Sequence, residues 1–190
     1  RHYVQTGQRR KAVSLIEKAW QVNTHPDLIP LWASAAPKSK KKSEAANLQW
    51  FERLLALNTG SAEGQLAVAK AAMEAGLWGE ARNYLKMAEN IRTSKKLYRY
   101  YALLEEKTGS NPEKVQEWLQ RAADAPPERT WICQETGRMY DNWHVYAPPH
   151  DSFNTIRWDF PFINESELLL AHKEPADIVT PQPVLEAPKA

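Results

Sequence analysis

The chain has 190 residues, of which 43% are hydrophobic and 25% are charged, and its formal net charge is +2. This is the composition of an ordinary water-soluble protein, and no stretch of 15 residues lacks a charge, which excludes a membrane-spanning segment within the chain. One cysteine excludes a disulfide framework, and the seven glycines lack the spacing of a phosphate-binding loop. Because the chain begins at Arg1 without an apolar signal segment, we expect any anchor or targeting signal to lie upstream.

Charge and proline content divide the chain into three parts. Residues 1–127 carry a net charge of about +7, residues 128–161 about −2 and residues 162–190 about −3. Nine of the thirteen prolines follow residue 125. These shifts predict a basic helical part, an appendage rich in Trp and Pro, and an acidic tail, in that order.

A small–bulky–small pattern recurs along the first part at spacings of 35, 34 and 34 residues. The four sets are Ala12, Ile16 and Ala19; Asn47, Phe51 and Leu54; Ala81, Leu85 and Ala88; and Val115, Leu119 and Ala122. A glycine precedes three of the sets, namely Gly7, Gly76 and Gly109. A helix commonly ends at a residue in the left-handed conformation, which glycine adopts most easily, so each of these glycines is expected to end the preceding helix. A 34-residue period of this kind resembles the tetratricopeptide repeat, in which two antiparallel helices form each unit. The pattern predicts an all-α, right-handed helical solenoid over residues 1–127, with its first repeat incomplete.

Seven helices are expected in this part. Their predicted ranges are 9–23, 27–36, 43–58, 62–75, 78–91, 95–108 and 112–124. Pro37 should end the second helix early, and the lysine-rich segment 37–43 is interpreted as a solvated loop, since it lacks the aromatic residues of a nucleic-acid site. Five residues are predicted to be almost fully buried, so that Leu119→Ala would open a cavity. They are Ala81, Leu85, Ala88, Leu119 and Ala122.

The appendage, residues 128–161, has the outline of a degenerate zinc ribbon. The four positions that hold metal in such a ribbon are occupied by Cys133, Thr136, Ala147 and His150. Threonine and alanine do not hold zinc as thiolates do, so no metal is expected. Cys133 is interpreted as a small buried apolar residue. The appendage is expected to be held together by its aromatic residues, namely Trp131, Trp143, Phe153 and Trp158.

The tail, residues 162–190, is acidic and rich in proline. A helical turn over 165–172 and an extended stretch over 178–185 are expected there. Because the repeats are basic, the hypothesis is that the tail occupies a groove of the repeats, its own or a neighbour's.

No catalytic constellation is visible in the sequence. The five histidines are scattered, and Cys133 lacks a basic neighbour that would activate its thiolate. Glutamates such as Glu105 and Glu106 lie on a lysine-rich helix, which favours solvated ion pairs. The chain is therefore predicted not to be an enzyme and to hold no cofactor, although His144 or His150 could ligate a haem iron.

The end of the repeats and the appendage together resemble the bacterial HemY family over about residues 25–161. The residues that carry this resemblance are Glu117, Trp118, Leu119, Ala122, Trp131, Gly137, Trp143, Pro148, Phe153, Trp158 and Pro161, together with 53–58 and 66–69. The resemblance implies a membrane-anchored repeat protein associated with haem biosynthesis, with the soluble part on the cytoplasmic face of the bacterial inner membrane. It implies no catalytic residues.

The first helices of stacked repeats line a concave groove, which predicts where a partner would bind. The residues assigned to this groove are Trp32, Leu66, Lys70, Met73, Lys96, Arg99, Leu103 and Glu106. Its lysines and arginine suit an acidic or C-terminal peptide. The expected function is a non-catalytic scaffold for protein partners, not nucleic acid, associated with the haem pathway. The alternative is a protein that binds haem or a porphyrin precursor directly.

Overall fold

The computed structural model describes residues 2–37, 44–109 and 111–161. The chain divides into two compact units, unit 1 (Arg1–Ala125) and unit 2 (Pro126–Ala190). The described residues are mostly helical with a small antiparallel sheet, which confirms the predicted helical class. The lysine-rich loop, apart from Pro37, and the acidic tail lie outside the described residues.

The helices of the described part all belong to unit 1. They are α1 (His2–Gln5), α2 (Arg9–Val22), α3 (Leu28–Ser34), α4 (Glu44–Ala56), α5 (Ala62–Glu74), α6 (Trp78–Ile91), α7 (Lys95–Lys107) and α8 (Pro112–Asp124). Helices α2 to α8 match the seven predicted ranges to within two residues at each end, whereas α1 was not predicted. Helix α3 ends at Ser34, before Pro37, as the proline rule requires.

Local chemistry explains where these helices begin and end. The side chains of Ser61 and Ser94 accept hydrogen bonds from the backbone N–H three residues on and so cap α5 and α7. The chain leaves the helical region through left-handed glycines, Gly76 with φ +71° and Gly109 with φ +69°. These two glycines, with Gly7 at φ +72°, confirm the stop signals predicted from the sequence.

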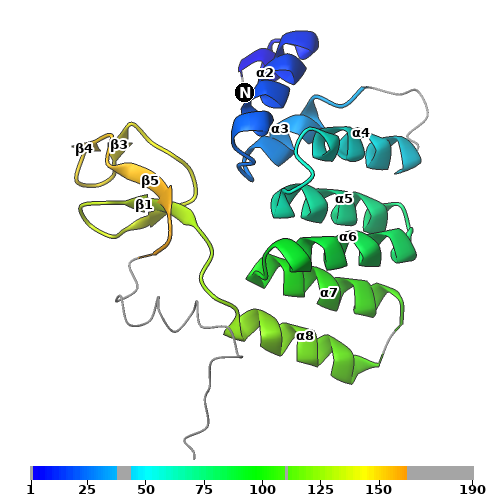
Figure 1. Cartoon of the computed structure of the whole chain (residues 1–190). Helices are drawn as coiled ribbons and strands as arrows, with labels where there is room; N and C mark the ends of the chain where they lie inside the picture. The colour runs from blue at the N-terminus through cyan, green and yellow to red at the C-terminus, as the bar shows by residue number, and fades with distance from the viewer. Residues whose placement is uncertain (1, 38–43, 110, 162–190) are drawn as a thin grey trace, which may run out of the picture. The chain divides into compact units, whose positions relative to one another are not determined.

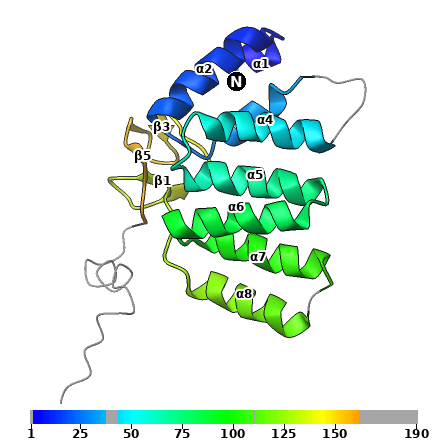
Figure 2. The same cartoon turned by 45° about the vertical axis from the view of Figure 1, so that its right-hand side comes forward.

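Helices α4 to α8 lie side by side in chain order (Figures 1 and 2). Alanines at the contacts allow the helix axes to approach closely, and Ala81 and Ala88 of α6 have no exposed surface. Larger apolar side chains fill the space between neighbouring helices, Leu85 and Leu97 among them. The core of unit 1 therefore runs continuously through the stack.

Ion pairs and tyrosine hydroxyls tie neighbouring helices together. Arg82 of α6 lies 2.6 Å from the Glu105 carboxylate of α7, which is only 5% exposed. Glu105 is thus a buried interhelical partner, and the interpretation of this residue as a solvated surface group is wrong. The Tyr101 hydroxyl donates to Glu89 at 2.9 Å, and burial, followed by this bond, raises the pKa of Tyr101.

One predicted core position is wrong. Ala81, Leu85, Ala88 and Ala122 are buried as predicted, but Leu119 is 51% exposed. The reason is positional. Leu85 of α6 lies in the core to which the next helix, α7, also contributes, whereas no later helix of unit 1 among the described residues follows α8 and covers Leu119.

Unit 2 is built from short antiparallel strands. They are β1 (Thr130–Cys133), β2 (Met139–Tyr140), β3 (Tyr146–Ala147), β4 (Ser152–Phe153) and β5 (Ile156–Asp159). One sheet has the order β2-β1-β5 and the other pairs β3 with β4. Trp131 faces Trp158 across β1 and β5, with ring centroids 5.2 Å apart.

The core of unit 2 matches the expected aromatic core only in part, since Trp131 packs on it and contacts Trp158. Cys133, Ala147 and Ile156 are buried, which confirms that Cys133 is a small buried residue. Trp143 and Phe153 are 45% and 66% exposed, so they do not hold the unit together. Strands of two residues present one side chain to each face, so that when Ala147 and Ser152 turn inward the neighbouring Phe153 points outward.

None of the described helices has both the length and the apolar character that crossing a membrane requires.

Candidate functional site

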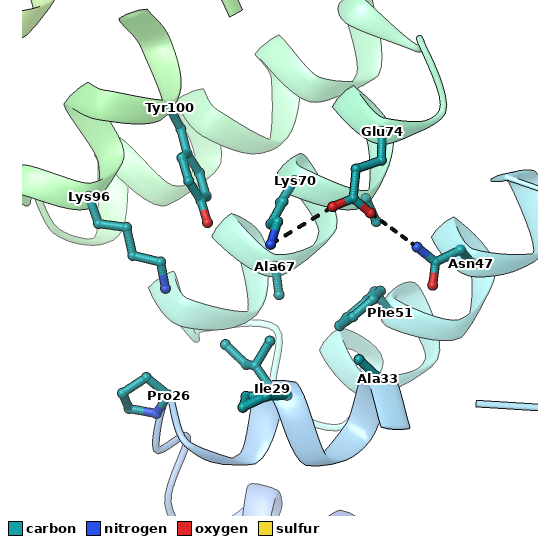
Figure 3. Close-up of a pocket in the computed structure, with 12 residues that line it drawn as sticks. Pro26, Ile29, Ala33, Asn47, Phe51, Ala67, Lys70, Glu74, Lys96 and Tyr100 are labelled. Atoms are coloured by element: carbon teal, nitrogen blue, oxygen red, sulfur yellow. Dashed lines mark hydrogen bonds and ion pairs between the residues drawn. The ribbon is translucent and has the colours of Figure 1, made fainter. Parts of the chain in front are cut away.

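A hollow of about 420 Å³ opens between the helices of unit 1. Its lining residues come from α3, α4, α5 and α7 and from the turn before α3 (Figure 3). They are Pro26, Ile29, Pro30, Ala33, Asn47, Phe51, Ala67, Lys70, Ala71, Glu74, Lys96 and Tyr100. We call this site the first hollow. Its volume lies within the range of about 300–1,000 Å³ found for small ligand pockets.

One side of the first hollow is apolar. Ile29 and Ala33 are four residues apart and therefore share one face of α3, which points into the hollow (Figure 3). Phe51 of α4 and Ala67 of α5 continue this surface. These side chains offer a place for an aliphatic or aromatic group.

The opposite side is polar and partly cross-linked. The Glu74 carboxylate lies 3.8 Å from the Lys70 ammonium and accepts a hydrogen bond of 3.5 Å from the Asn47 amide (Figure 3). On α7, the Tyr100 hydroxyl points into the hollow, and Lys96 is held at 2.9 Å by Glu63 of α5. The polar side therefore combines two ammonium groups, a carboxylate, an amide and a phenol.

The electrostatic balance of the first hollow is weakly positive. Its lining holds two lysines and one glutamate. His25 stands next to Pro26 but adds no charge at neutral pH, because burial lowers its pKa and outweighs the opposing effect of Asp27 and Glu63. A ligand with one carboxylate beside an apolar group suits this arrangement.

The structure places the eight predicted groove residues in three groups. Lys70 and Lys96 line the first hollow. Arg99, Leu103 and Glu106 are exposed on α7 but do not line it. Trp32, Leu66 and Met73 are buried in the core, so their assignment to a groove is wrong.

These three residues are buried because neighbouring helices cover the parts of α3 and α5 on which they lie. Helix α5 lies between α4 and α6 (Figures 1 and 2), so nine of its residues are buried, including Leu66 and Met73. Lys70 and Glu74 are the pair that α5 leaves at the surface of the hollow. Trp32 is not among the lining residues of the hollow, and its ring stacks on Trp50 of α4.

Several lining residues were not identified from the sequence. Tyr100 lies four residues after Lys96 on one face of α7, and this spacing could have indicated it. Asn47 and Phe51 belong to α4, a second helix of its repeat, which was assigned to packing only.

Cys133 is the single cysteine of the chain and is buried in unit 2. The Thr136 hydroxyl first, and then that of Thr155, lowers the pKa of its thiol to about 7, against the opposing effect of burial. The sulfur is fully buried and lies 3.3 Å from the Thr155 hydroxyl oxygen. Within the described residues no three His, Cys, Asp or Glu side chains are grouped so that they could hold a metal ion.

Comparison with family models, with curated proteins and with solved structures gives no match to this chain.

Proposed function

We propose that this protein is a non-catalytic scaffold that binds a segment of a partner protein in the first hollow. The observation that carries the proposal is the shared lining, since three first helices of successive hairpins, α3, α5 and α7, contribute to one concavity. This is the surface that stacked helical hairpins use for peptides. A peptide with an apolar side chain on Ile29 and Phe51 and a carboxylate near Lys70 would match both sides of the site.

The architecture in this proposal is a right-handed tetratricopeptide-like solenoid with a ribbon-like appendage that has lost its metal. The support is the 34-residue spacing between Leu85 and Leu119 together with the left-handed glycines at corresponding helix ends. In unit 2, the turn that follows Cys133 closes with a 2.9 Å bond from the Gly137 N–H to the Cys133 carbonyl, as a ribbon knuckle would. The resemblance to HemY extends the proposal to a membrane-anchored protein of the haem pathway, on the cytoplasmic face of the inner membrane.

Filling the first hollow tests this function. Ala33 is exposed and lines the hollow, so Ala33→Trp should occupy it without disturbing the core. We expect at least one partner to be captured from a bacterial lysate by the unaltered protein and to be reduced about tenfold or more with Ala33→Trp, a loss of about 1.4 kcal/mol in binding. Quantitative mass spectrometry of the captured proteins is the measurement.

The matched control is Ala123→Trp, which adds the same ring to an exposed alanine of α8 outside the hollow. It should leave the capture unchanged. If every captured protein binds Ala33→Trp as well as the control variant, the first hollow is not the partner site.

Direct binding of haem or a porphyrin is the second candidate, and Tyr100 is the observation that favours it. A tyrosine phenolate can ligate haem iron, and the hollow places the Tyr100 hydroxyl between an apolar surface and two lysines that could pair with propionates. Titration with haem, followed in the Soret band, separates the candidates. Tight stoichiometric binding that Tyr100→Phe abolishes would favour the tetrapyrrole role, and weak binding unaffected by Tyr100→Phe would count against it.

A further inference from the structure

A second hollow, of about 490 Å³, lies between α2 and α4. We call it the arginine hollow, because three of its seven lining residues are arginines. The lining residues are Arg9, Arg10, Val13, Ser14, Glu17, Trp50 and Arg53. None of them lines the first hollow, so the inference drawn from them does not depend on the proposed scaffold function.

Two of the arginines are held in place by the protein. The Arg9 Nε donates to the Ala35 carbonyl at 2.5 Å, and its guanidinium carbon lies 5.5 Å from the centre of the Trp50 ring. The Arg53 guanidinium pairs with the Glu17 carboxylate at 2.5 Å and lies 5.4 Å from the same ring. Guanidinium groups fixed in this way lose little conformational entropy when an oxyanion binds.

The third arginine, Arg10, does not contribute an interaction that stabilises the fold. Arg10 is exposed, and its side chain forms no ion pair or hydrogen bond with any residue that the structure describes. The first turn of α2 contains no acidic residue, although the helix dipole favours acids there, and it carries Arg9, Arg10 and Lys11 instead. The first turn of α2 therefore carries a cluster of basic residues that the stability of the helix alone would not favour.

The charge and the number of donors indicate which anion would fit. Three arginines and Glu17 give the arginine hollow a net charge of +2. A phosphate monoester carries about −1.5 to −2 at neutral pH and has three strong acceptor oxygens. A single carboxylate would leave positive charge uncompensated, whereas a monoester can accept bidentate hydrogen bonds from more than one guanidinium and one from the Ser14 hydroxyl.

We propose that the arginine hollow binds a phosphate monoester group. Arg9 and Arg53 would present fixed guanidinium groups beside Trp50, and Arg10 would close over the bound oxyanion. The same group occurs on soluble metabolites and on the headgroup of phosphatidic acid, so both sources belong to the test.

The test uses glycerol 3-phosphate as the soluble probe and isothermal titration as the measurement. Arg10→Gln should weaken its binding about tenfold, which is the effect of losing one charge-assisted hydrogen bond. Lys18→Gln is the charge-matched control, because Lys18 is exposed on the same helix and does not line the hollow. It should change the affinity by no more than about twofold, as expected for a screened charge.

A second arm identifies the source of the phosphate group. Phosphatidylcholine vesicles with and without phosphatidic acid are sedimented with the unaltered protein and with both variants. Binding that requires phosphatidic acid and Arg10, without binding of glycerol 3-phosphate, assigns the site to a lipid headgroup, and the reverse assigns it to a soluble ligand. The proposal is overturned if neither probe binds, or if Arg10→Gln and Lys18→Gln weaken binding equally.

Discussion

Replacing Trp32 by alanine should lower the free energy of unfolding of unit 1 by about 3–5 kcal/mol, the range for removal of a buried aromatic side chain. Trp32 is fully buried, and its ring stacks on that of Trp50 with centroids 4.2 Å apart and an angle of 11°. The pair is also cross-linked by hydrogen bonds, since each indole N–H donates to the other residue's backbone carbonyl at 2.9 Å. The substitution removes the ring contact and one of these bonds, so it should release α3 from α4.

A phenylalanine at the same position separates the two contributions. Trp32→Phe keeps an apolar ring but removes the bond from the Trp32 indole N–H to the Trp50 carbonyl, which should cost about 0.5–1.5 kcal/mol because that carbonyl keeps its partner within α4. Urea unfolding followed by far-ultraviolet circular dichroism measures unit 1, because the helices of the described residues all lie in it. If Trp32→Phe is neutral, the reciprocal hydrogen bonds do not stabilise the unit. If Trp32→Ala is also neutral, α3 does not pack on α4 as described.

Much of unit 1 could be predicted because its signals are local. The period of small and bulky residues gave α6 as Trp78–Ile91 to the residue, and the glycine rule located left-handed turns at Gly76 and Gly109. These features depend on backbone sterics and on one face of one helix, which a sequence displays directly. The short helix α1 shows no apolar period over its four residues, and it was missed.

The first hollow was harder to predict because it depends on how helices rotate about their axes. Counting from the glycines assigned Leu66, Lys70 and Met73 of α5 to one groove, and their spacing of three and four residues does place them on one face. The spacing does not show that neighbouring helices bury Leu66 and Met73 while Lys70 stays exposed. The lysine remains at the surface because burying an ammonium group without a full set of partners is unfavourable. The polarity of each residue would therefore have been a better guide to the hollow than its position. Two polar residues follow this rule, because Glu74 lies on the same face of α5 as Lys70 and Tyr100 lies on the same face of α7 as Lys96.

The arginine hollow has no signal in the linear sequence for a related reason. Arg9 and Arg10 are separated from Arg53 by more than forty residues, and Trp50 was assigned no role of its own. Only the tertiary arrangement of α2 and α4 brings the three arginines to one hollow and places two of them, Arg9 and Arg53, over the Trp50 ring. Tertiary convergence of this kind cannot be derived from periodicity, since each residue taken alone fits an exposed helix position.

Two leucines at the same position of their repeats should differ sharply in their contribution to stability. Leu85 of α6 and Leu119 of α8 are 34 residues apart, but Leu85 has no exposed surface and Leu119 is 51% exposed. Leu85→Ala should lower the free energy of unfolding by about 2–5 kcal/mol, because it opens a cavity in the core of unit 1. Leu119→Ala should change it by no more than about 0.5 kcal/mol, as for a surface substitution.

The comparison serves as its own control, since the side chain, the substitution and the repeat position are the same. Helix α8 is attached to α7 through its other side, where Trp118 stacks on Tyr101 with centroids 4.4 Å apart and Ala122 is buried. Loss of Leu119 leaves these contacts intact, so the urea midpoint should stay near that of the unaltered protein while that of Leu85→Ala falls. Equal destabilisation by the two substitutions would contradict this account, because it would require Leu119 to be covered in solution by a segment or a second molecule that packs on α8 as α7 packs on α6.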